Sequence, residues 1–373
     1  MITHDLLVFG AGGHARKLAR AFQAERHQVH AFVSSRPANT DEIDGIPVHS
    51  FASLPAELRN LGTIACGVFN RGDAYQGLSE ILNENGFDQI LWPWDYYPAL
   101  HRQLGWCYWL DSEPRNLQHW QKDPSFQELM ELLADDESRL IVQRIIAFRS
   151  GSDMAFSAFK SEEPQYFNHL TLQALPIDRP ISYLDIGAYN GDTLEHLCAK
   201  AIVGTAILFE PDPANFRALT QNTRRLVNQY PQLRPFALPL GAGSHYGYVS
   251  LEAGGEASSL HLRSPIQLGE VTTVTVTPLD DILPTECVDF IKIDVEGHDR
   301  DAIQGMLGVL RRSRPVVAVS LYHRPHDFVD LTIALRQALQ GMSYSFYIRQ
   351  HLYNSFETVL YAIPAHDSCG GQL

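Results

Sequence analysis

Residues 182–193 read SYLDIGAYNGDT, and this stretch decides the fold of the C-terminal half of the chain. An apolar run typical of a strand leads into Gly187 and Gly191, and a helix-like stretch begins at Thr193. A strand, a glycine loop and a helix in this order let backbone N–H groups approach a ligand closely. A second apolar run ends in Glu210, 19 positions after Gly191, where an acidic residue commonly binds the hydroxyls of a ribose. The pattern predicts a nucleoside-binding α/β sheet.

The spacing of the loop indicates which nucleoside it binds. A dinucleotide site requires Gly-x-Gly-x-x-Gly, whereas this loop reads Asp-x-Gly-x-x-x-Gly and begins at Asp185. A carboxylate at this position would repel a diphosphate but would suit a cationic ligand such as S-adenosylmethionine. The alternative is that Asp185 only caps the turn.

Three further motifs follow in order: EPDPANF at 210–216, DFIKIDVEG at 289–297 and LYH at 321–323. Together with the glycine loop they resemble the FkbM family of methyltransferases, over about residues 165–363. The resemblance implies a class I methyltransferase fold, which is a seven-stranded doubly wound α/β sheet whose last strand is antiparallel, and S-adenosylmethionine as cofactor. One departure from the broader class is Tyr189, where many class I enzymes carry glycine.

The resemblance and the loop pattern together give a set of expected cofactor-binding residues. Asp185 is expected at the methionine end and Glu210 at the ribose, while the backbone of Gly187–Gly191 lies against the ligand. Ser258 is implied by the resemblance alone as a contact to adenine, and a plain polar loop is the alternative there. The full set is Asp185, Gly187, Ala188, Tyr189, Asn190, Gly191, Asp192, Thr193, Glu210, Pro211 and Ser258.

The expected catalytic residues are Asp294, Glu296 and His323. Asp294 and Glu296 flank Val295 at the end of a predicted strand, so alternation places both carboxylates on one side. His323 ends the next strand, and either an imidazole or a carboxylate can remove a proton from a hydroxyl group. For Glu296 the alternative is the N-cap of the helix that begins near Asp299.

A divalent metal held by these three residues and His298 is a second alternative, as in catechol-type O-methyltransferases. The spacing matches no recognised metal motif, so the main hypothesis assigns no metal ligand. His298 is otherwise read as a surface residue without a role.

The chain is predicted to have three parts: a smaller Rossmann-like α/β domain at 1–111, a helical connector at 112–175 and the methyltransferase domain at 176–373. Strands and helices alternate over residues 5–95, which predicts a parallel sheet with helical crossovers. Apolar residues at helical spacing between 112 and 150 predict the connector. Segments 246–252 and 272–279 suggest an inserted hairpin, and 344–349 and 358–363 an antiparallel closing pair.

A second glycine loop, GAGGHA at 10–15, follows the first predicted strand. It resembles the N-terminal domain of sugar O- and N-acyltransferases that hold nucleotide sugars. The functional interpretation is a phosphate-bearing ligand over the helix N-terminus, and the alternative is a fold element that binds nothing. The next strand ends near Arg36, where enzymes that use NAD place an acid.

The amino-acid composition restricts the classes of molecule that this chain is expected to bind. The formal net charge is −14 over 373 residues, which argues against nucleic acid or an anionic membrane surface. Five scattered cysteines without a Cys-x-x-Cys pair fit a cytoplasmic protein with reduced thiols. The sequence predicts neither a signal peptide nor a transmembrane helix.

The leading hypothesis is an S-adenosylmethionine-dependent O-methyltransferase acting on a hydroxyl group of a sugar, a nucleotide sugar or another small metabolite, and it allows a homo-oligomer. The alternatives are an NAD(P)-dependent sugar-nucleotide oxidoreductase that uses the first glycine loop, and a non-catalytic nucleotide-binding protein. No Tyr-x-x-x-Lys pair supports the oxidoreductase.

Overall fold

The computed structural model describes residues 2–36, 40–69, 74–155, 160–176, 178–252, 259–261 and 271–365. The chain folds into two compact units, and neither is continuous in sequence. Unit 1 contains residues 1–123, 140–160 and 352–356, and unit 2 contains residues 124–139, 161–351 and 357–373. The segment 112–175, which the sequence predicts to be a connector, is thus divided between the two units.

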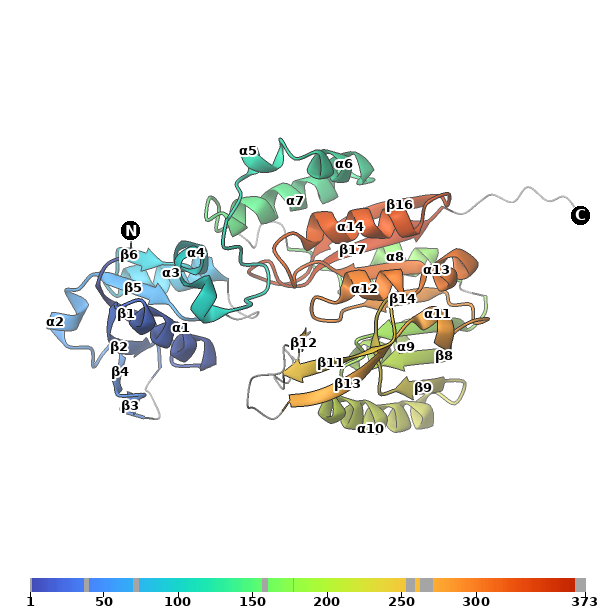
Figure 1. Cartoon of the computed structure of the whole chain (residues 1–373), viewed down its shortest axis with the longest axis horizontal. Coiled ribbons are helices and arrows are strands. Elements are labelled where there is room, and N and C mark those ends of the chain that lie inside the picture. Colours follow the sequence, from blue (N-terminus) through green and yellow to red (C-terminus); the bar gives the residue numbers. More distant parts are fainter. Residues whose placement is uncertain are drawn as a thin grey trace, which may run out of the picture. The chain divides into compact units, whose positions relative to one another are not determined.

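Unit 1 is built on a six-stranded sheet with the order β3-β4-β2-β1-β5-β6 (Figure 1). All neighbouring strands are parallel except β3, which is antiparallel to β4. The strands are β1 (Asp5–Phe9), β2 (Gln28–Ser34), β3 (Glu42–Ile43), β4 (Ile46–Ser50), β5 (Thr63–Cys66) and β6 (Gln89–Leu91). The predicted smaller α/β domain is confirmed, although the sequence pattern did not predict β3 and β4.

Among the described residues, three helices of unit 1 connect these strands and a fourth follows β6. The described part of the predicted connector contains four further helices, three before residue 150 and one, α8 (His169–Ala174), in unit 2. The first group is α1 (Gly13–Ala24), α2 (Ala56–Arg59), α3 (Tyr75–Glu84) and α4 (Pro93–Leu104). The second group is α5 (Leu117–Trp120), α6 (Pro124–Leu132) and α7 (Asp136–Arg149). In unit 2, the buried guanidinium of Arg349 lies 2.6 Å from Asp135, which directly precedes α7, so this ion pair ties the start of the helix to the sheet.

Unit 2 is built on a seven-stranded sheet with the order β16-β17-β15-β14-β7-β8-β9. Strand β17 runs antiparallel to both of its neighbours, and the other neighbouring pairs are parallel. The strands are β7 (Ile181–Ile186), β8 (Val203–Phe209), β9 (Arg234–Leu238), β14 (Phe290–Ile293), β15 (Val316–Ser320), β16 (Tyr344–Gln350) and β17 (Thr358–Pro364). The predicted seven-stranded sheet with a reversed last strand is therefore confirmed.

The central strands of this sheet are covered on both faces. Every residue of β14 and β15 is buried, as expected for parallel strands between two helical layers. The helices are α8 (His169–Ala174), α9 (Asp192–Cys198), α10 (Pro213–Gln229), α11 (Leu279–Ile282), α12 (Asp299–Gln304), α13 (Leu307–Ser313) and α14 (Asp327–Ala338). A polar side chain in these strands needs a partner, because burying it unpaired costs free energy.

The inserted segment between β9 and β14 forms a separate four-stranded sheet with the order β10-β13-β11-β12. The predicted hairpin corresponds to β11 (Gly247–Glu252) and β13 (Val271–Thr277), which pair antiparallel. The shorter strands are β10 (Gly241–Ala242) and β12 (Ser259–His261). Ser258 lies outside the described residues. No helix among the described residues has both the length and the apolar character that crossing a membrane requires.

Candidate functional site

The predicted site residues meet at one edge of the unit 2 sheet. Asp185 lies near the end of β7, Glu210 directly follows β8, and Asp294 directly follows β14. His323 follows the end of β15 by three residues. Because these four strands are parallel, their carboxyl ends share one edge, and this is where open α/β sheets bind their ligands.

The loop after β7 needs glycine at two positions. Gly187 has φ of +84°, and a Cβ atom there would collide with the backbone carbonyl of Asp294. The amides of Gly187 and Ala188 both donate to the carbonyl of Phe209, each at 2.9 Å. Gly191 has φ of +85° and is the N-cap of α9. The loop is therefore fixed between the ends of β7, β8 and β14.

The rest of the loop is held by short polar contacts. The side chain of Asn190 accepts a hydrogen bond from the amide of Asp192 at 3.1 Å, and Asp192 accepts one from the amide of Thr193 at 2.7 Å. Tyr189 has φ of +47°, a left-handed conformation that costs a non-glycine residue about 1–2 kcal/mol. Asp192 is exposed at the start of α9, so its carboxylate remains accessible to a ligand.

Glu210 is bound to the same loop. Its carboxylate accepts hydrogen bonds from the amide of Tyr189 and from the amide of Asp212, both at 2.8 Å. Pro211 lies between Glu210 and Asp212 in the chain. The side chain of Asp212 caps α10 by accepting hydrogen bonds from the amides of Ala214 and Asn215. Burial raises the pKa of Glu210 to about 7, although the two backbone hydrogen bonds act in the opposite direction. The group therefore titrates near neutral pH.

Asp185 does not face solvent. Its side chain is 0% exposed, and its oxygen Oδ1 lies 3.2 Å from the ammonium of Lys292, which is 4% exposed. The two residues are directly opposite each other on β7 and β14. Lys292 also donates to the carbonyl of Gly187 at 2.5 Å. Burial raises the pKa of Asp185, and the charge of Lys292 opposes this shift.

Asp294, Glu296 and His323 come together as predicted from their strand ends. The Nε2 atom of His323 lies 3.0 Å from Asp294 and 3.7 Å from Glu296. The side chains of Asp294 and Glu296 are 19% and 16% exposed, whereas the ring of His323 is 0% exposed. A ligand at this edge can therefore touch the carboxylates, while the ring lies behind them.

The surroundings of His323 favour its protonated form. Its Nδ1 atom lies 3.2 Å from Asp299, whose carboxylate also accepts hydrogen bonds from the amides of Val295 and Gly297. Burial alone would lower the pKa of His323, but the carboxylates of Asp299, Glu296 and Asp294 together raise it well above its ordinary value. To act as a base, His323 would first have to release this proton.

Tyr166 also belongs to this cluster. Its hydroxyl lies 2.9 Å from Asp294 and 3.0 Å from Ser320. Since an ionised carboxylate only accepts, Tyr166 donates to Asp294 and the hydroxyl of Ser320 donates to Tyr166. Burial and the charge of Asp294 raise the pKa of Tyr166 well above its ordinary value, so it remains a donor. Both oxygens of Asp294 are thus held, one by Tyr166 and one by His323.

Two overlapping groups of side chains have the atom types that a metal ion requires: Asp294 with Glu296 and His323, and Asp299 with His323 and Asp327. Within each group the potential ligand atoms lie within 4.8 Å of one another. A metal at either position needs the neutral form of His323, because a protonated imidazole offers no lone pair. A protonated His323 balances the same carboxylates by charge, so the hypothesis without a metal ligand is retained as a prediction.

Lys292, Tyr166 and the contact between Asp299 and His323 were not predicted from the sequence. Lys292 carried a signal, because a single lysine inside the apolar run of β14 must find a buried partner. Tyr166 carried none, because it lies in an irregular stretch 128 residues before Asp294.

The glycine loop of unit 1 has a different environment. Gly10 has φ of +102° and its amide donates to the carbonyl of Val33 at 2.7 Å. The ring of His14 lies 3.1 Å from the hydroxyl of Tyr96, which donates to the carbonyl of Cys66. Burial and the nearby Lys17 lower the pKa of His14 to about 4, so this ring is neutral at neutral pH.

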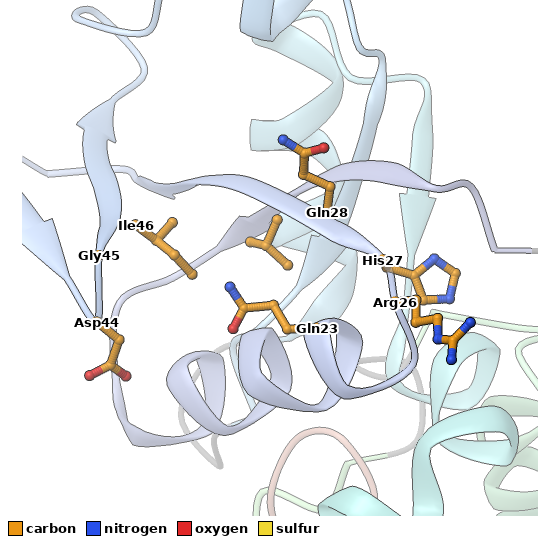
Figure 2. A pocket seen from close by; sticks show the side chains of 8 residues that line it. Gln23, Arg26, His27, Gln28, Asp44, Gly45 and Ile46 are labelled. Carbon is orange, nitrogen blue, oxygen red and sulfur yellow. The ribbon is translucent and has the colours of Figure 1, made fainter.

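Unit 1 also has a surface hollow between the end of α1 and the start of β2 (Figure 2). It is lined by Gln23, Arg26, His27, Gln28, Val29, Asp44, Gly45 and Ile46. Asp44 is already paired with Arg20 at 2.8 Å. The hollow lies where β2 begins, at the opposite edge of the sheet from the glycine loop, and ligands of open α/β sheets bind at the carboxyl edge. It is therefore not a candidate for the nucleoside site.

Comparison with known proteins agrees with the geometry of unit 2. Residues 185–346 match the model of the methyltransferase FkbM domain. The chain is 27% identical over 155 residues to AglP, a hexuronic acid methyltransferase of Haloferax volcanii, and this match covers 41% of the chain but only 61% of that protein. The crystal structure of methyltransferase FkbM from Methylobacillus flagellatus superposes with a TM-score of 0.72 at 22% identity, covering 96% of this chain and 90% of the other. At this identity the superposition supports the fold alone.

Proposed function

Residues 185–346 form a methyltransferase FkbM domain, and from this premise we propose that the chain transfers the methyl group of S-adenosylmethionine to a hydroxyl group of a sugar or another small metabolite. The observation that carries the proposal is the glycine loop 187–191, which is held against the carboxylate of Glu210. A tight glycine loop beside an acid at the end of the next strand suits a nucleoside.

The residues of the loop fit this cofactor. Gly187 and Gly191 let the loop turn tightly against Asp294 and Leu219, where a side chain would collide. Glu210 is proposed to bind the ribose hydroxyls, since it lies directly after β8 and accepts from the amide of Tyr189 in this loop. Asp192 and Thr193 begin α9, where a backbone amide and an accessible carboxylate can hold the methionine end. These roles remain proposals, together with those of Ala188, Tyr189, Asn190 and Pro211. When bound, S-adenosylmethionine supplies an electrophilic methyl group and leaves as a neutral thioether.

The acceptor is proposed to lie against Asp294 and Glu296, because these side chains are partly exposed at the same edge. An acceptor hydroxyl must lose its proton as the new carbon–oxygen bond forms. Asp294 is proposed to orient that hydroxyl and to receive its proton during the transfer, since Tyr166 and His323 hold its two oxygens in one orientation. Burial opposes the shift, but the hydrogen bond from His323 and the charge of Lys292 hold the pKa of Asp294 well below its ordinary value, so Asp294 is ionised before the transfer. His323 then acts through Asp294, and its positive charge balances the neighbouring carboxylates.

The proposed acceptor class is a hydroxyl of a hexuronic acid or a related sugar. Its support is the hexuronic acid methyltransferase to which the chain is similar, so the proposal rests on a match that covers 61% of that protein. The net charge of −14 makes a nucleic acid acceptor unfavourable.

Calorimetric titration with S-adenosylhomocysteine tests the proposal first, with NADH and NADPH as control ligands. We expect binding of S-adenosylhomocysteine and none of the nicotinamide cofactors. Transfer of a radiolabelled methyl group to glucuronic acid and UDP-glucuronic acid, compared with glucose and UDP-glucose, then tests the acceptor class. Absence of S-adenosylhomocysteine binding would refute the cofactor, and methylation of a nitrogen or of the neutral sugars alone would refute the acceptor class.

A further inference from the structure

Lys292 is a buried cation at the centre of the unit 2 sheet. Its strand, β14, is buried at every residue, and the Lys292 side chain is 4% exposed. Removing an ammonium group from water costs several kcal/mol unless it is paired and hydrogen-bonded. The groups that pair with the Lys292 ammonium therefore indicate which part of the site it stabilises.

The partners of Lys292 lie at the carboxyl edge of the sheet, where the glycine loop begins. Lys292 is 3.2 Å from Asp185 and 2.5 Å from the carbonyl oxygen of Gly187, and it lies 5.7 Å from the centre of the Tyr166 ring. Burial alone would lower the pKa of Lys292, but the carboxylates of Asp185 and Asp294 raise it above its ordinary value. The lysine therefore stays charged throughout the physiological pH range.

The contact with Gly187 fixes one peptide group of the glycine loop. The carbonyl oxygen of Gly187 accepts from Lys292, and the N–H of Ala188, in the same peptide group, donates to the carbonyl of Phe209 at 2.9 Å. This peptide group is thus held from both sides, by a side chain of β14 and by the end of β8. Its orientation decides how the following loop residues face a ligand.

We propose that Lys292 is a positioning residue for S-adenosylmethionine: it binds the carboxylate of Asp185 and holds the glycine loop in its binding shape, so that Asp185 acts through Lys292 and does not contact the ligand. This inference rests on the proposed function, because it concerns how the same site binds its cofactor. The burial of Asp185 supports it, since a 0% exposed carboxylate has no surface to offer a ligand.

Titration calorimetry of S-adenosylmethionine and S-adenosylhomocysteine separates the two roles of Asp185. The first ligand has a sulfonium and the second a neutral thioether. If Asp185 acts through Lys292, Lys292→Met and Asp185→Asn will each weaken both ligands by the same factor, at least tenfold. The double variant should lose little more than either single variant, because the two residues form one unit.

Direct contact with the ligand gives another pattern. Asp185→Asn would then weaken S-adenosylmethionine much more than S-adenosylhomocysteine, and the losses from the two single variants would add. Either result overturns the inference, as does unchanged affinity in Lys292→Met. Lys292→Met leaves the Asp185 carboxylate unpaired, and this variant could fail to fold. Two other variants then serve the same test: the double variant removes both charges, and Lys292→Gln keeps a donor toward Gly187. Normal affinity in the double variant would also overturn the inference.

Arg349→Met is the matched control. Arg349 is a cation of unit 2 with a 5% exposed side chain, and its ion pair with Asp135 at 2.6 Å does not involve the glycine loop. This variant should lose stability in thermal denaturation but keep its affinity for S-adenosylhomocysteine within about twofold. A wild-type protein that binds neither ligand would refute the proposed function, whereas a wild type that binds and Lys292 variants that bind equally well would refute only this inference.

Discussion

The two units of this chain contain the same structural element in two environments. Each begins its sheet with a strand that ends in a left-handed glycine, Gly10 at +102° in unit 1 and Gly187 at +84° in unit 2. In unit 1 the loop is followed by a neutral contact between His14 and Tyr96. In unit 2 the corresponding edge contains buried or half-buried charged groups: Asp185, Glu210, Lys292, Asp294, Glu296 and His323.

A glycine loop thus indicates the fold, whereas buried charged groups indicate where chemistry takes place. A tight turn after a strand needs glycine whether or not anything binds there. Burying a carboxylate or an ammonium costs free energy that a fold can avoid with apolar residues. The charged edge of unit 2 therefore distinguishes the site, and the two loops provide matched positions for testing this.

The largest expected effect comes from adding one methyl group to each loop. Gly187→Ala should abolish binding of S-adenosylhomocysteine and destabilise unit 2 by about 4 kcal/mol or more, because the Cβ collides with the Asp294 carbonyl and φ is +84°. Gly10→Ala is the matched variant in unit 1: φ is +102° and the Cβ would lie 3.2 Å from the Val68 side chain, so it should lower stability but leave the affinity for S-adenosylhomocysteine unchanged. Thermal denaturation and calorimetry measure both effects. Equal tolerance at the two positions would contradict the structural difference between the loops.

The next largest effect concerns turnover. Asp294→Asn keeps the size of the side chain but removes the charge that is held by Tyr166 and His323. With an acceptor from the screen above, kcat should fall by about 100-fold or more, the range of lost acid–base catalysis. The affinity for S-adenosylhomocysteine should stay within about twofold, and a large loss of that affinity would place Asp294 in the cofactor site instead.

Removing the hydroxyl of Tyr166 should have a smaller effect on the same step. Tyr166→Phe leaves Asp294 with one hydrogen bond fewer, a loss of about 1.5–2 kcal/mol that corresponds to about 10- to 30-fold in kcat. Tyr344→Phe removes a comparable hydroxyl that donates to the carbonyl of Pro315, at the opposite end of β15 from Ser320 and His323. If both variants lower kcat equally, the effect of Tyr166 is one of general stability.

The affinity for S-adenosylhomocysteine should depend on pH through Glu210. Its pKa of about 7 means that lowering the pH protonates the carboxylate in the free protein, and a ligand that needs the ionised form then binds less tightly. For a pKa of 7, the dissociation constant at pH 6 should be about tenfold larger than at pH 8. In Glu210→Gln the dependence should disappear, and a dependence that persists would assign it to another group.

The smallest effect is expected in unit 1. His14→Gln changes a neutral ring that contacts Tyr96, and we expect the affinity for S-adenosylhomocysteine and the methyl transfer rate to stay within about twofold. Calorimetry and the methyl transfer assay check this. A tenfold loss in either would show that the neutral loop takes part in the reaction, which would remove the contrast between the units.

The sequence predicted those features that depend on local order along the chain. The glycine loop and the strand ends at Glu210, Asp294 and His323 follow from alternation and from the parallel topology. The reversed β17 follows from the short separation of the closing pair and from the resemblance to class I methyltransferases. The contact between Asp294 and His323 could be expected because their strands are neighbours in the sheet.

The features that the sequence did not reveal depend on pairing between distant segments. Asp185 was expected to meet a cationic ligand, whereas in the structure its cation is Lys292 on the adjacent strand. That pair depends on the register of β7 and β14, which no single strand pattern contains. Tyr166 reaches Asp294 from an irregular segment whose path is set by tertiary packing.

The discontinuity of unit 1 has a consequence for synthesis of the chain on the ribosome. The amide of Tyr75 donates to the side chain of Asn354 at 3.1 Å, across a separation of 279 residues, and the ring of Phe69 lies 5.5 Å from that of Phe356. At about 5–20 residues per second, the N-terminal sheet would wait about 14–56 s for these last partners. Until then the N-terminal sheet exposes the apolar surface that residues 352–356 cover. The first unit to emerge from the ribosome is therefore among the last to be completed. A chain that stops before residue 352 leaves both units unfinished.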